Sequence, residues 1–536
     1  MQLEKNTINL IKKLSEKHPK PQNILYLYGT AGFRMNHKLL DSVMFRSGLF
    51  SSLRSKKLQG KTIGIMITAS HNQAEDNGIK LIDPYGEMLE ISWEEHFNNI
   101  SNAENTDILI SLIEEMISSQ KIDLKIKSNV IYAGDTRQSR LNLINSLVDG
   151  LSCFETSWTN YELLTTPQLH YLVRSINTKN TPETCGKPTE LGYYIKLSKA
   201  YQYLMKDQIC QTPLYVDCAN GIGALKLENL CHLINKNILN VKIINKNTNI
   251  PSDLNRECGA DFVKVQHKLP LGIETNTKGR CLSFDGDADR IIYYYIDSDN
   301  NFKLLDGDKI ASLIAIFMVE LIKTASIDVN IGIVQTAYSN RSSTNFISKI
   351  LKIPVNCVLA GVKHLHHAAM QYDCGIYFEA NGHGTIIFSK KMEFLLTSYQ
   401  EKSPIQLAAI NYLKELINLV NQTIGDSLSN MLLVEVILAY KNWGIEEWDS
   451  IYTDFPSKMI NVITKNKELY ETIGSNYRLV KPKKIQQKID ALVSNYKEGR
   501  AFIRASGTEN IDKVYAEALT KKDADELAFK VAQLIY

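Results

Sequence analysis

The sequence lacks a strong excess of charge of one sign. Its 61 Lys and Arg residues are nearly balanced by 58 Asp and Glu residues, which gives a formal net charge of +3. A protein that binds nucleic acid through the phosphate backbone needs a concentrated basic face. The balance therefore predicts no nucleic-acid partner, and the short basic run at 481–484 is interpreted as a solvated turn.

Segments that direct a chain to a membrane or out of the cell are also missing. Residues 1–20 are charged and amphipathic, without the apolar core of a signal peptide. The most apolar stretch, 310–322, contains Ser312 and Glu320 and is too short to span a bilayer, so it predicts a buried helix. The nine cysteines include no Cys-x-x-Cys pair, which indicates reduced thiols. We expect a cytoplasmic protein with no membrane partner.

The composition is that of an ordinary globular protein, with 44% hydrophobic and 22% charged residues in 536 residues. This length corresponds to roughly three to four domains. Short apolar runs, such as 62–68 and 331–337, alternate with helix-period segments such as 308–323. The alternation predicts α/β domains with mixed or parallel sheets.

A small-residue loop, Thr-Ala-Ser-His-Asn at 68–72, follows the apolar run at 63–67. Open α/β sheets place reactive groups beyond the carboxyl ends of their strands, so Ser70 is a candidate nucleophile with an exposed hydroxyl. A plain Ser/Asn turn is the alternative. A serine hydrolase is a weaker one, because Ser70 lacks the Gly-x-Ser-x-Gly elbow.

A second loop, 285–290, alternates carboxylates with Gly and Ala, at Asp285, Asp287 and Asp289. The small intervening residues allow all three carboxylates to converge, and hard oxygen ligands at this density suit Mg²⁺ or Ca²⁺. An EF-hand would need Gly at the sixth position and Glu at the twelfth, where this sequence has Arg290 and Ile296. The alternative is a solvated acidic turn.

Two further loops carry groups suited to sugars and anions. The loop at 379–385, Glu-Ala-Asn-Gly-His-Gly-Thr, offers a carboxylate and an amide that suit sugar hydroxyls. The loop at 504–510, Arg-Ala-Ser-Gly-Thr-Glu-Asn, combines an arginine, two hydroxyls and a glycine, which suits a phosphate. A β-hairpin turn and a surface turn are the respective alternatives.

In this order, the four loops resemble those of the α-D-phosphohexomutase superfamily, and most closely its eukaryotic phosphoacetylglucosamine mutase branch. The likeness covers nearly the whole chain, with further matching segments at 28–34, 164–170, 258–261 and 361–367. The glucose and mannose branches usually carry Glu-x-Ser-Gly-His in the sugar loop. Here Asn381 takes the place of that serine, which is similar to the N-acetylglucosamine branch.

The resemblance implies an α/β protein of four domains around a central cleft. Three related α/β domains with mixed sheets would span 1–185, 186–299 and 300–447, and a smaller α+β domain 448–536. It implies interconversion of N-acetylglucosamine 6-phosphate and 1-phosphate through a phosphoserine and a 1,6-bisphosphate, on the route to UDP-N-acetylglucosamine. Mg²⁺ would be the cofactor and a hexose 1,6-bisphosphate the activator. A phosphosugar would be the small-molecule partner, with no obligate protein partner.

The resemblance also assigns residue roles. Ser70 would be the phosphoserine and, with Asp285, Asp287 and Asp289, would hold Mg²⁺. The other expected catalytic residues are Arg34, His71, Lys80, Arg290 and His383, with either His383 or Lys80 as general base. The expected substrate-binding residues are Glu379, Asn381, Gly382, Arg504, Ser506, Gly507, Thr508 and Lys513.

Two positions depart from the family pattern. Ala505 stands where the phosphate loop usually has Pro, and Lys513 where a second arginine usually lies, so we expect weaker phosphate affinity. Other functions left open are the same chemistry on glucose or mannose phosphates, a catalytically silent phosphosugar-binding paralogue, and a phosphatase.

Overall fold

In the computed structural model, the described residues are 3–30, 32–206, 208–210, 212–277, 279–398, 403–463, 470–475, 477–505 and 511–535. The chain forms two compact units. The first comprises Met1–Leu304 and Glu415–Val436, and the second comprises Leu305–Lys414 and Ile437–Tyr536. The expected α/β class with mixed sheets is confirmed, whereas the expected central cleft stays a prediction.

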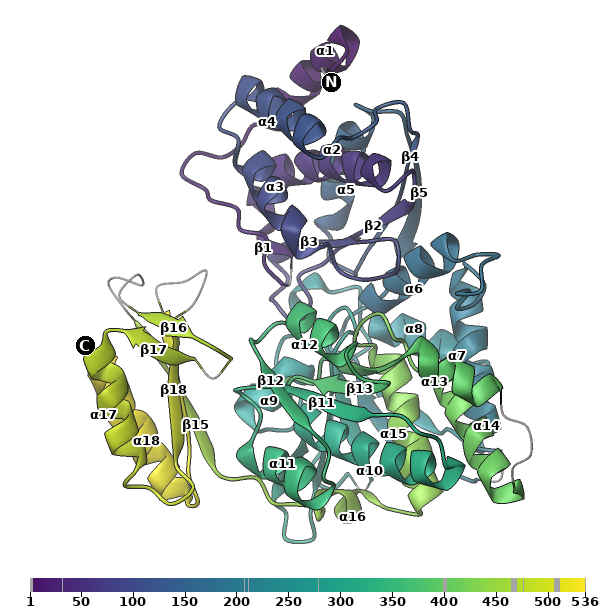
Figure 1. The fold of residues 1–536 in the computed structure, drawn as a ribbon, viewed down its shortest axis with the longest axis vertical. Helices are drawn as coiled ribbons and strands as arrows, with labels where there is room; N and C mark the ends of the chain where they lie inside the picture. The colour runs from purple at the N-terminus through teal and green to yellow at the C-terminus, as the bar shows by residue number, and fades with distance from the viewer. Residues whose placement is uncertain are drawn as a thin grey trace. The chain divides into compact units, whose positions relative to one another are not determined.

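The first unit begins with a mixed five-stranded sheet of order β1-β3-β2-β4-β5 (Figure 1). Its strands are β1 (Phe33–Asn36), β2 (Thr62–Ile67), β3 (Asp76–Ile82), β4 (Ser128–Gly134) and β5 (Thr156–Leu163). Strand β2 runs parallel to β4 and antiparallel to β3. All six residues of β2 are buried, as expected for a central strand covered on both faces. The serine loop begins where this strand ends.

Helices α2 (Asp41–Lys57) and α5 (Arg140–Leu151) pack closely together. A Cβ on Gly48 would lie 2.5 Å from the Leu147 carbonyl oxygen, and one on Gly150 would lie 2.0 Å from the Phe45 carbonyl oxygen. Glycine at both positions therefore allows the two backbones to approach. On the same sheet, α6 (Thr166–Asn177) contacts β2 and β4.

A second five-stranded sheet in the first unit has the order β10-β9-β8-β6-β7. The strands are β6 (Leu214–Asp217), β7 (Val241–Ile244), β8 (Cys281–Phe284), β9 (Ile291–Ile296) and β10 (Phe302–Leu305). Helices α8 (Gly223–Cys231) and α9 (Ala260–Gln266) lie between strands of this sheet along the chain. Because β10 belongs to this sheet, we propose a domain boundary near residue 305 instead of the expected 299. The other expected boundaries stay predictions.

The second unit contains a four-stranded sheet of order β12-β11-β13-β14. The strands are β11 (Ile331–Thr336), β12 (Val355–Val358), β13 (Cys374–Phe378) and β14 (Gly384–Phe388). Strand β11 is parallel to β12 and β13, and β13 and β14 form an antiparallel hairpin. The sugar loop lies at the tip of this hairpin.

The C-terminal part of the second unit is α+β. Strands β15 (Ser457–Ile463), β19 (Ile511–Glu517) and β18 (Arg500–Ala505) form an antiparallel sheet, and β16 (Glu471–Ile473) pairs with β17 (Arg478–Lys481). Helices α17 (Lys483–Val493) and α18 (Lys521–Ala532) contact each other, and α18 packs on β15 and β19 (Figure 1). Their apolar faces and the sheet form one core.

The remaining helices complete the two units. They are α1 (Lys5–Ser15), α3 (Ile91–Asn102), α4 (Thr106–Ser119), α7 (Glu190–Leu204), α10 (Gly307–Ala325), α11 (Arg341–Asn345), α12 (Val362–Ala369), α13 (Lys390–Thr397), α14 (Pro404–Leu419), α15 (Ser427–Lys441) and α16 (Ile445–Asp449). Helix α10 is buried along most of its length, as predicted for 310–322. Within the described ranges, no helix is both long enough and apolar enough to cross a membrane.

Candidate active site

The hydroxyl of Ser70 lies within a group of charged side chains in the first unit. Arg34 Nη2 donates to Ser70 Oγ at 2.9 Å, and Lys80 Nζ donates to it at 3.0 Å. Ser70 Oγ in turn donates to Asp287 Oδ2 at 3.0 Å. The expectation of an exposed hydroxyl is wrong, because these side chains cover it and leave Ser70 0% exposed. Two cations beside one hydroxyl are suited to a serine that carries a phosphate.

A buried arginine holds the backbone of the serine loop. The Arg137 guanidinium donates to four carbonyl oxygens, those of Ser70 (3.1 Å), Asn72 (2.8 Å), Gln73 (2.5 Å) and Asp76 (2.8 Å). Its Nε pairs with Asp135 Oδ2 at 3.1 Å. All five guanidinium N–H groups are therefore used, and the loop has one fixed path.

Arg137 and its partner Asp135 are not among the residues predicted from the sequence. A signal was present, because the Asp-Thr-Arg segment at 135–137 follows β4 as the serine loop follows β2. Polar residues at the ends of two adjacent parallel strands meet at the same edge of a sheet. Thr68 Oγ1 confirms that proximity by donating to Asp135 Oδ2 at 2.7 Å.

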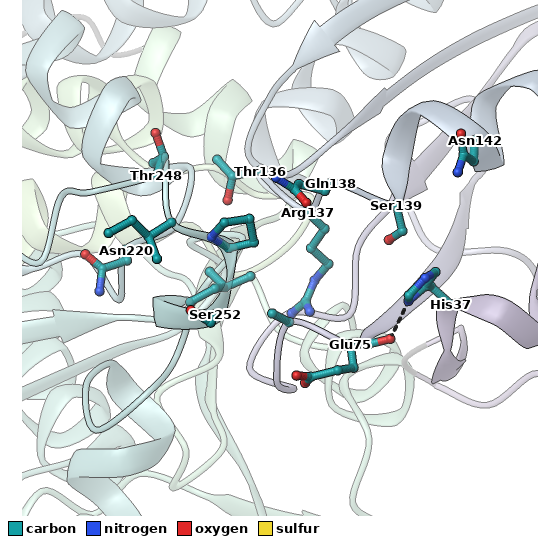
Figure 2. A pocket seen from close by; sticks show the side chains of 14 residues that line it. His37, Glu75, Thr136, Arg137, Gln138, Ser139, Asn142, Asn220, Thr248 and Ser252 are labelled. Carbon is teal, nitrogen blue, oxygen red and sulfur yellow. Dashed lines mark hydrogen bonds between the residues drawn. The ribbon is translucent and has the colours of Figure 1, made fainter.

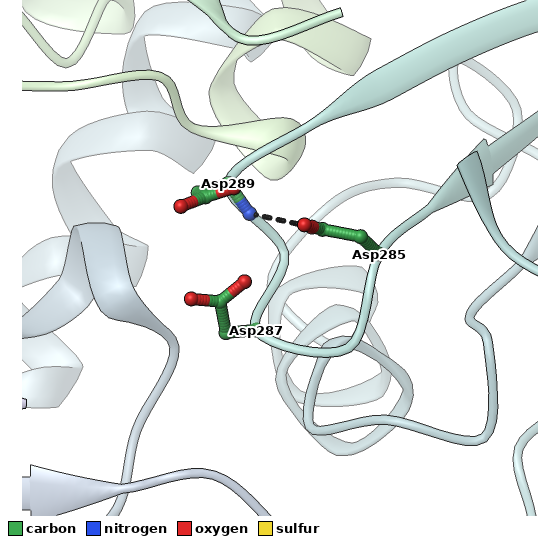
Figure 3. A group of neighbouring side chains, drawn as sticks. All are labelled: Asp285, Asp287 and Asp289. Carbon is green, nitrogen blue, oxygen red and sulfur yellow. Dashed lines mark hydrogen bonds between the residues drawn. The ribbon is translucent and has the colours of Figure 1, made fainter. Parts of the chain in front are cut away.

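The three aspartates of the second loop converge between β8 and β9, and Figure 3 shows their carboxylates facing one another. One oxygen from each of Asp285, Asp287 and Asp289 lies within 4.8 Å of the others. Asp285 Oδ2 and Asp287 Oδ1 are buried and accept no hydrogen bond from the part of the chain that the structure describes. Burial and the charges of Asp289 and Asp287 raise the pKa of Asp285 well above its usual value. A bound divalent cation would relieve this repulsion, so the residues fit a metal site.

Gly286 allows the aspartate loop to approach the serine loop. A Cβ at this position would lie 2.5 Å from the Ser70 carbonyl oxygen, which is closer than carbon and oxygen can approach. Thr166, at the start of α6, adds a hydrogen bond of 2.5 Å from its Oγ1 to Asp287 Oδ2. From the sequence, Thr166 was expected only as part of the matching segment 164–170.

Lys80 connects the serine to two of the aspartates from strand β3. Its Nζ lies 2.8 Å from Asp287 Oδ2 and 2.9 Å from Asp289 Oδ2. Burial opposes the charge of Lys80, but Asp287 and Asp289 outweigh it and raise its pKa above the usual value. The ammonium group therefore stays protonated, and it neutralises the aspartates and the serine oxygen together.

The expected residues Arg34, His71 and Arg290 lie close to Ser70 and the three aspartates. Arg34 Nη1 and His71 Nδ1 are 3.4 Å apart. Arg290 Nη1 pairs with Asp261 at 3.6 Å, and its Nε lies 3.8 Å from Asp285 Oδ2. The charge of Arg290, burial and the charge of Arg34 lower the pKa of His71 far below its usual value. His71 is therefore neutral at physiological pH.

In the second unit, the sugar loop is a tight hairpin turn, as the alternative interpretation proposed. Gly382 has a φ of 88° and donates its N–H to the Glu379 carbonyl oxygen at 2.9 Å. Asn381 Nδ2 donates to Glu379 Oε2 at 3.3 Å, and the His383 N–H donates to Asn381 Oδ1 at 3.0 Å. The turn brings Glu379, Asn381 and His383 together, so it is compatible with sugar binding.

Of the phosphate-loop residues, Arg504 and Lys513 can be placed. They are direct partners across the β18–β19 pair, and side chains paired in this way share a face of the sheet. The two positive charges are therefore adjacent. The expected residues Ser506, Gly507 and Thr508 lie outside the described residues.

A separate polar cavity of about 450 Å³ borders Arg137 in the first unit (Figure 2). Residues that contribute to its lining include Glu75, which follows the serine loop, and Ser139, Asn220 and Ser252. His37 Nδ1 lies 2.9 Å from the Glu75 carbonyl oxygen. None of the expected catalytic or binding residues lines this cavity.

The serine among charged side chains, the cluster of three aspartates and the mixed α/β sheets define a phosphohexomutase. Residues 187–292 and 306–443 match the families described as phosphoacetylglucosamine mutase AMG1, domains II and III. Residues 52–107 and 459–534 match phosphoglucomutase/phosphomannomutase, alpha/beta/alpha domain I and C-terminal domain. The resemblance seen in the sequence is thereby confirmed.

Individual relatives are similar to this protein over nearly the whole chain. Phosphoacetylglucosamine mutase of Homo sapiens is 45% identical, with 99% of this chain and 97% of the relative covered. Two structures of Aspergillus fumigatus N-acetylphosphoglucosamine mutase are 44% identical and cover 99% of both chains. One is in complex with glucose 1,6-bisphosphate (TM-score 0.96), and the other with GlcNAc-6P and magnesium (TM-score 0.95). The chain therefore belongs to the phosphoacetylglucosamine mutase family, which is a family of isomerases.

Proposed function

We propose that this protein interconverts N-acetylglucosamine 6-phosphate and N-acetylglucosamine 1-phosphate through a phosphoserine and a 1,6-bisphosphate. The observation that carries the proposal is the Ser70 hydroxyl, held at 2.9–3.0 Å by Arg34, Lys80 and Asp287. The relatives' mutase activity and the GlcNAc-6P complex of the fungal neighbour support the choice of sugar. N-acetylglucosamine 1-phosphate would then be used on the route to UDP-N-acetylglucosamine.

The residues of the first unit would carry out phosphoryl transfer. Asp285, Asp287, Asp289 and Ser70 would hold Mg²⁺, which when bound would polarise the phosphoryl oxygens. A phosphoserine carries about −1.5 to −2 charges, which the side chains of Lys80 and Arg34 are placed to neutralise. Both cations, with Arg290, would also stabilise the charge that spreads over the phosphoryl oxygens during transfer. His71 would lie beside Arg34 without adding a charge of its own to the site.

The residues of the second unit would bind the phosphosugar. Glu379, Asn381 and Gly382 would form the sugar site, and Arg504 and Lys513 would bind the phosphate that is not reacting. Ser506, Gly507 and Thr508 remain part of the proposed phosphate site. A sugar hydroxyl must lose its proton in the reaction, and of the two expected bases we propose His383, because the raised pKa of Lys80 keeps that ammonium group protonated. A hexose 1,6-bisphosphate would prime Ser70 and serve as the activator.

The proposal extends to the cell compartment and the partners. The nine cysteines are all free thiols, which supports a reducing compartment, so we propose the cytoplasm. The proposed partner is a small phosphosugar, without an obligate protein partner, a nucleic acid or a membrane.

A coupled assay for the 1-phosphate product tests the reaction. N-acetylglucosamine 6-phosphate and glucose 6-phosphate are offered in parallel with Mg²⁺ and a trace of hexose 1,6-bisphosphate. We expect kcat/KM to favour the acetylated sugar and activity to disappear in Ser70→Ala. A preference for glucose 6-phosphate would contradict the role given to Asn381. Steady release of inorganic phosphate would indicate a phosphatase. If neither sugar phosphate is turned over, the protein would be a catalytically silent binding protein.

A further inference from the structure

Tyr477, between β16 and β17, contacts the phosphate-binding arginine of the second unit. The Arg504 guanidinium carbon lies 5.3 Å from the centre of the Tyr477 ring and 5.8 Å from that of Tyr338. A guanidinium over aromatic faces is attracted by the ring electrons. Burial opposes the charge of Arg504, but Tyr338, Tyr477 and Glu379 outweigh it and raise its pKa, so Arg504 stays charged.

The hydroxyl of the same tyrosine reaches toward the sugar loop. The Ala360 N–H donates to the Tyr477 hydroxyl at 3.0 Å, and the next amide along the chain, that of Gly361, donates to Glu379 Oε1 at 3.1 Å. Two successive backbone amides therefore bind a tyrosine beside the phosphate arginine and the carboxylate of the sugar loop. Gly361 has a φ of 130°, which side chains rarely allow, so this local path favours glycine.

Packing fixes the Tyr477 ring. Tyr477 is 5% exposed and belongs to a cluster with Phe502 and Tyr515 of the C-terminal sheet and Ala337 after β11. Its ring centre lies 5.5 Å from that of Phe502 and 6.1 Å from that of Tyr338. Such aromatic contacts restrict the ring to one orientation, so the hydroxyl and the guanidinium hold their separation.

We propose that Tyr477 is a positioning residue that sets the place of Arg504 relative to Glu379. The inference rests on the proposed function, in which Arg504 binds phosphate and Glu379 binds sugar hydroxyls. A rigid link between the two sites would match the fixed distance between phosphate and hydroxyls in one hexose phosphate. Binding groups that are held in place before the ligand arrives lose less freedom on binding.

Two substitutions separate the two contacts of Tyr477. Tyr477→Phe keeps the ring over Arg504 and removes the hydroxyl that accepts from Ala360. We expect the dissociation constant for N-acetylglucosamine 6-phosphate to rise about fivefold, and that for inorganic phosphate to stay within about twofold of wild type. Tyr477→Leu removes both contacts and should weaken the binding of inorganic phosphate as well, by about fivefold.

A double-mutant cycle with Glu379→Ala tests whether the hydroxyl acts through Glu379. Binding of N-acetylglucosamine 6-phosphate is measured by calorimetry for wild type, both single variants and the double variant. In the Glu379→Ala background, Tyr477→Phe should weaken binding by less than about twofold. An effect as large as in wild type would overturn the proposal.

A matched control separates positioning from general loss of stability. Tyr470, in the same C-terminal part, donates from its hydroxyl to the Ile535 carbonyl oxygen at 2.7 Å. Tyr470→Phe therefore removes one comparable hydrogen bond away from Arg504 and should leave both dissociation constants unchanged. Equal weakening by Tyr470→Phe and Tyr477→Phe, with matching falls in melting temperature, would show that Tyr477 is merely structural.

The same samples distinguish this inference from the proposed function. Turnover of N-acetylglucosamine 6-phosphate by wild type together with an additive cycle would refute the positioning role alone. Coupled binding without turnover would refute the proposed reaction while the positioning role stands. Absence of binding by wild type would refute both.

Discussion

Arg137 Nη2 donates to the carbonyl oxygen of Ser70 at 3.1 Å, so the residue proposed to carry the phosphate is held by its backbone as well as by its hydroxyl. The same guanidinium spans the loop to Asp76 and pairs with Asp135, and both members of the pair are buried. Asn255 Nδ2 donates to the carbonyl oxygens of Ser70 and Asn72 at 2.8 and 2.9 Å, so the serine loop is held by two side chains, of which Arg137 makes more of the bonds. The backbone of Ser70 is therefore positioned by one set of side chains, and its hydroxyl is contacted by another.

Arg137→Lys should reduce kcat by about 100-fold with a smaller change in KM, because a lysine keeps the charge but cannot bind four carbonyl oxygens in a fork. The coupled mutase assay gives both constants, and calorimetry should show a lower melting temperature. Arg140→Lys serves as the control, since Arg140 pairs with the largely exposed Glu162 at 3.3 Å. Equal losses in the two variants would contradict a specific role for Arg137.

Gly286→Ala should impair both catalysis and metal binding. The new Cβ would meet the Ser70 carbonyl oxygen at 2.5 Å, so the aspartate loop and the serine loop must separate. We expect kcat to fall at least about tenfold, because displacements well under 1 Å disturb phosphoryl transfer. Gly444→Ala is the matched control, since its Cβ would meet only the end of the flexible Glu447 side chain. Wild-type kcat in Gly286→Ala would show that the loops need not touch.

The positions of the serine, aspartate and sugar loops at strand ends could be predicted from the sequence, because each follows a short apolar run and is rich in small residues. Ser70, the three aspartates and Glu379 could be found in this way, since strand ends are visible locally. The role of Thr166 and the burial of Ser70 could not, because they depend on partners distant in sequence. Thr166 and Asp287, for example, are 121 residues apart. The pairing of β10 with β9, on which the proposed boundary near residue 305 rests, is likewise tertiary information.

Asp285→Asn should stabilise the metal-free protein while abolishing its response to Mg²⁺. Burial and the neighbouring carboxylates make the charge of Asp285 costly, as its raised pKa shows, and an amide removes that charge. The Asn oxygen can still accept from the N–H groups of Asp289 and Arg290. In EDTA the variant should melt at a higher temperature than wild type. With saturating Mg²⁺ only wild type should gain stability. A lower melting temperature of the variant in EDTA would contradict this account.

His18 should make stability depend on pH at a site remote from the serine loop. Burial opposes its charge, but hydrogen bonds of 2.9 Å to Asp41 and 3.2 Å to Asp149 outweigh it and raise its pKa. A raised pKa contributes stability that is fully present below the unfolded value of about 6.5 and is lost as pH rises through the folded value.

His18→Gln should therefore cost about 1 kcal/mol more at pH 5.5 than at pH 9, with unchanged kcat at either pH. Urea unfolding of wild type and variant at both pH values measures the difference. A cost that is the same at both values would mean that folding does not raise the pKa of His18.

Lys513→Arg should lower KM for the sugar phosphate. Lys513 lies directly across from Arg504, so an arginine here would place a second fork-shaped donor beside the first. Lysine supplies the charge but not two parallel hydrogen bonds to one phosphate. We expect KM to fall about threefold with little change in kcat, because the proposed contact is to the phosphate that does not react. Lys458→Arg, on the exposed strand β15, controls for a general effect of arginine. An unchanged or higher KM in Lys513→Arg would show that this position does not contact the phosphate.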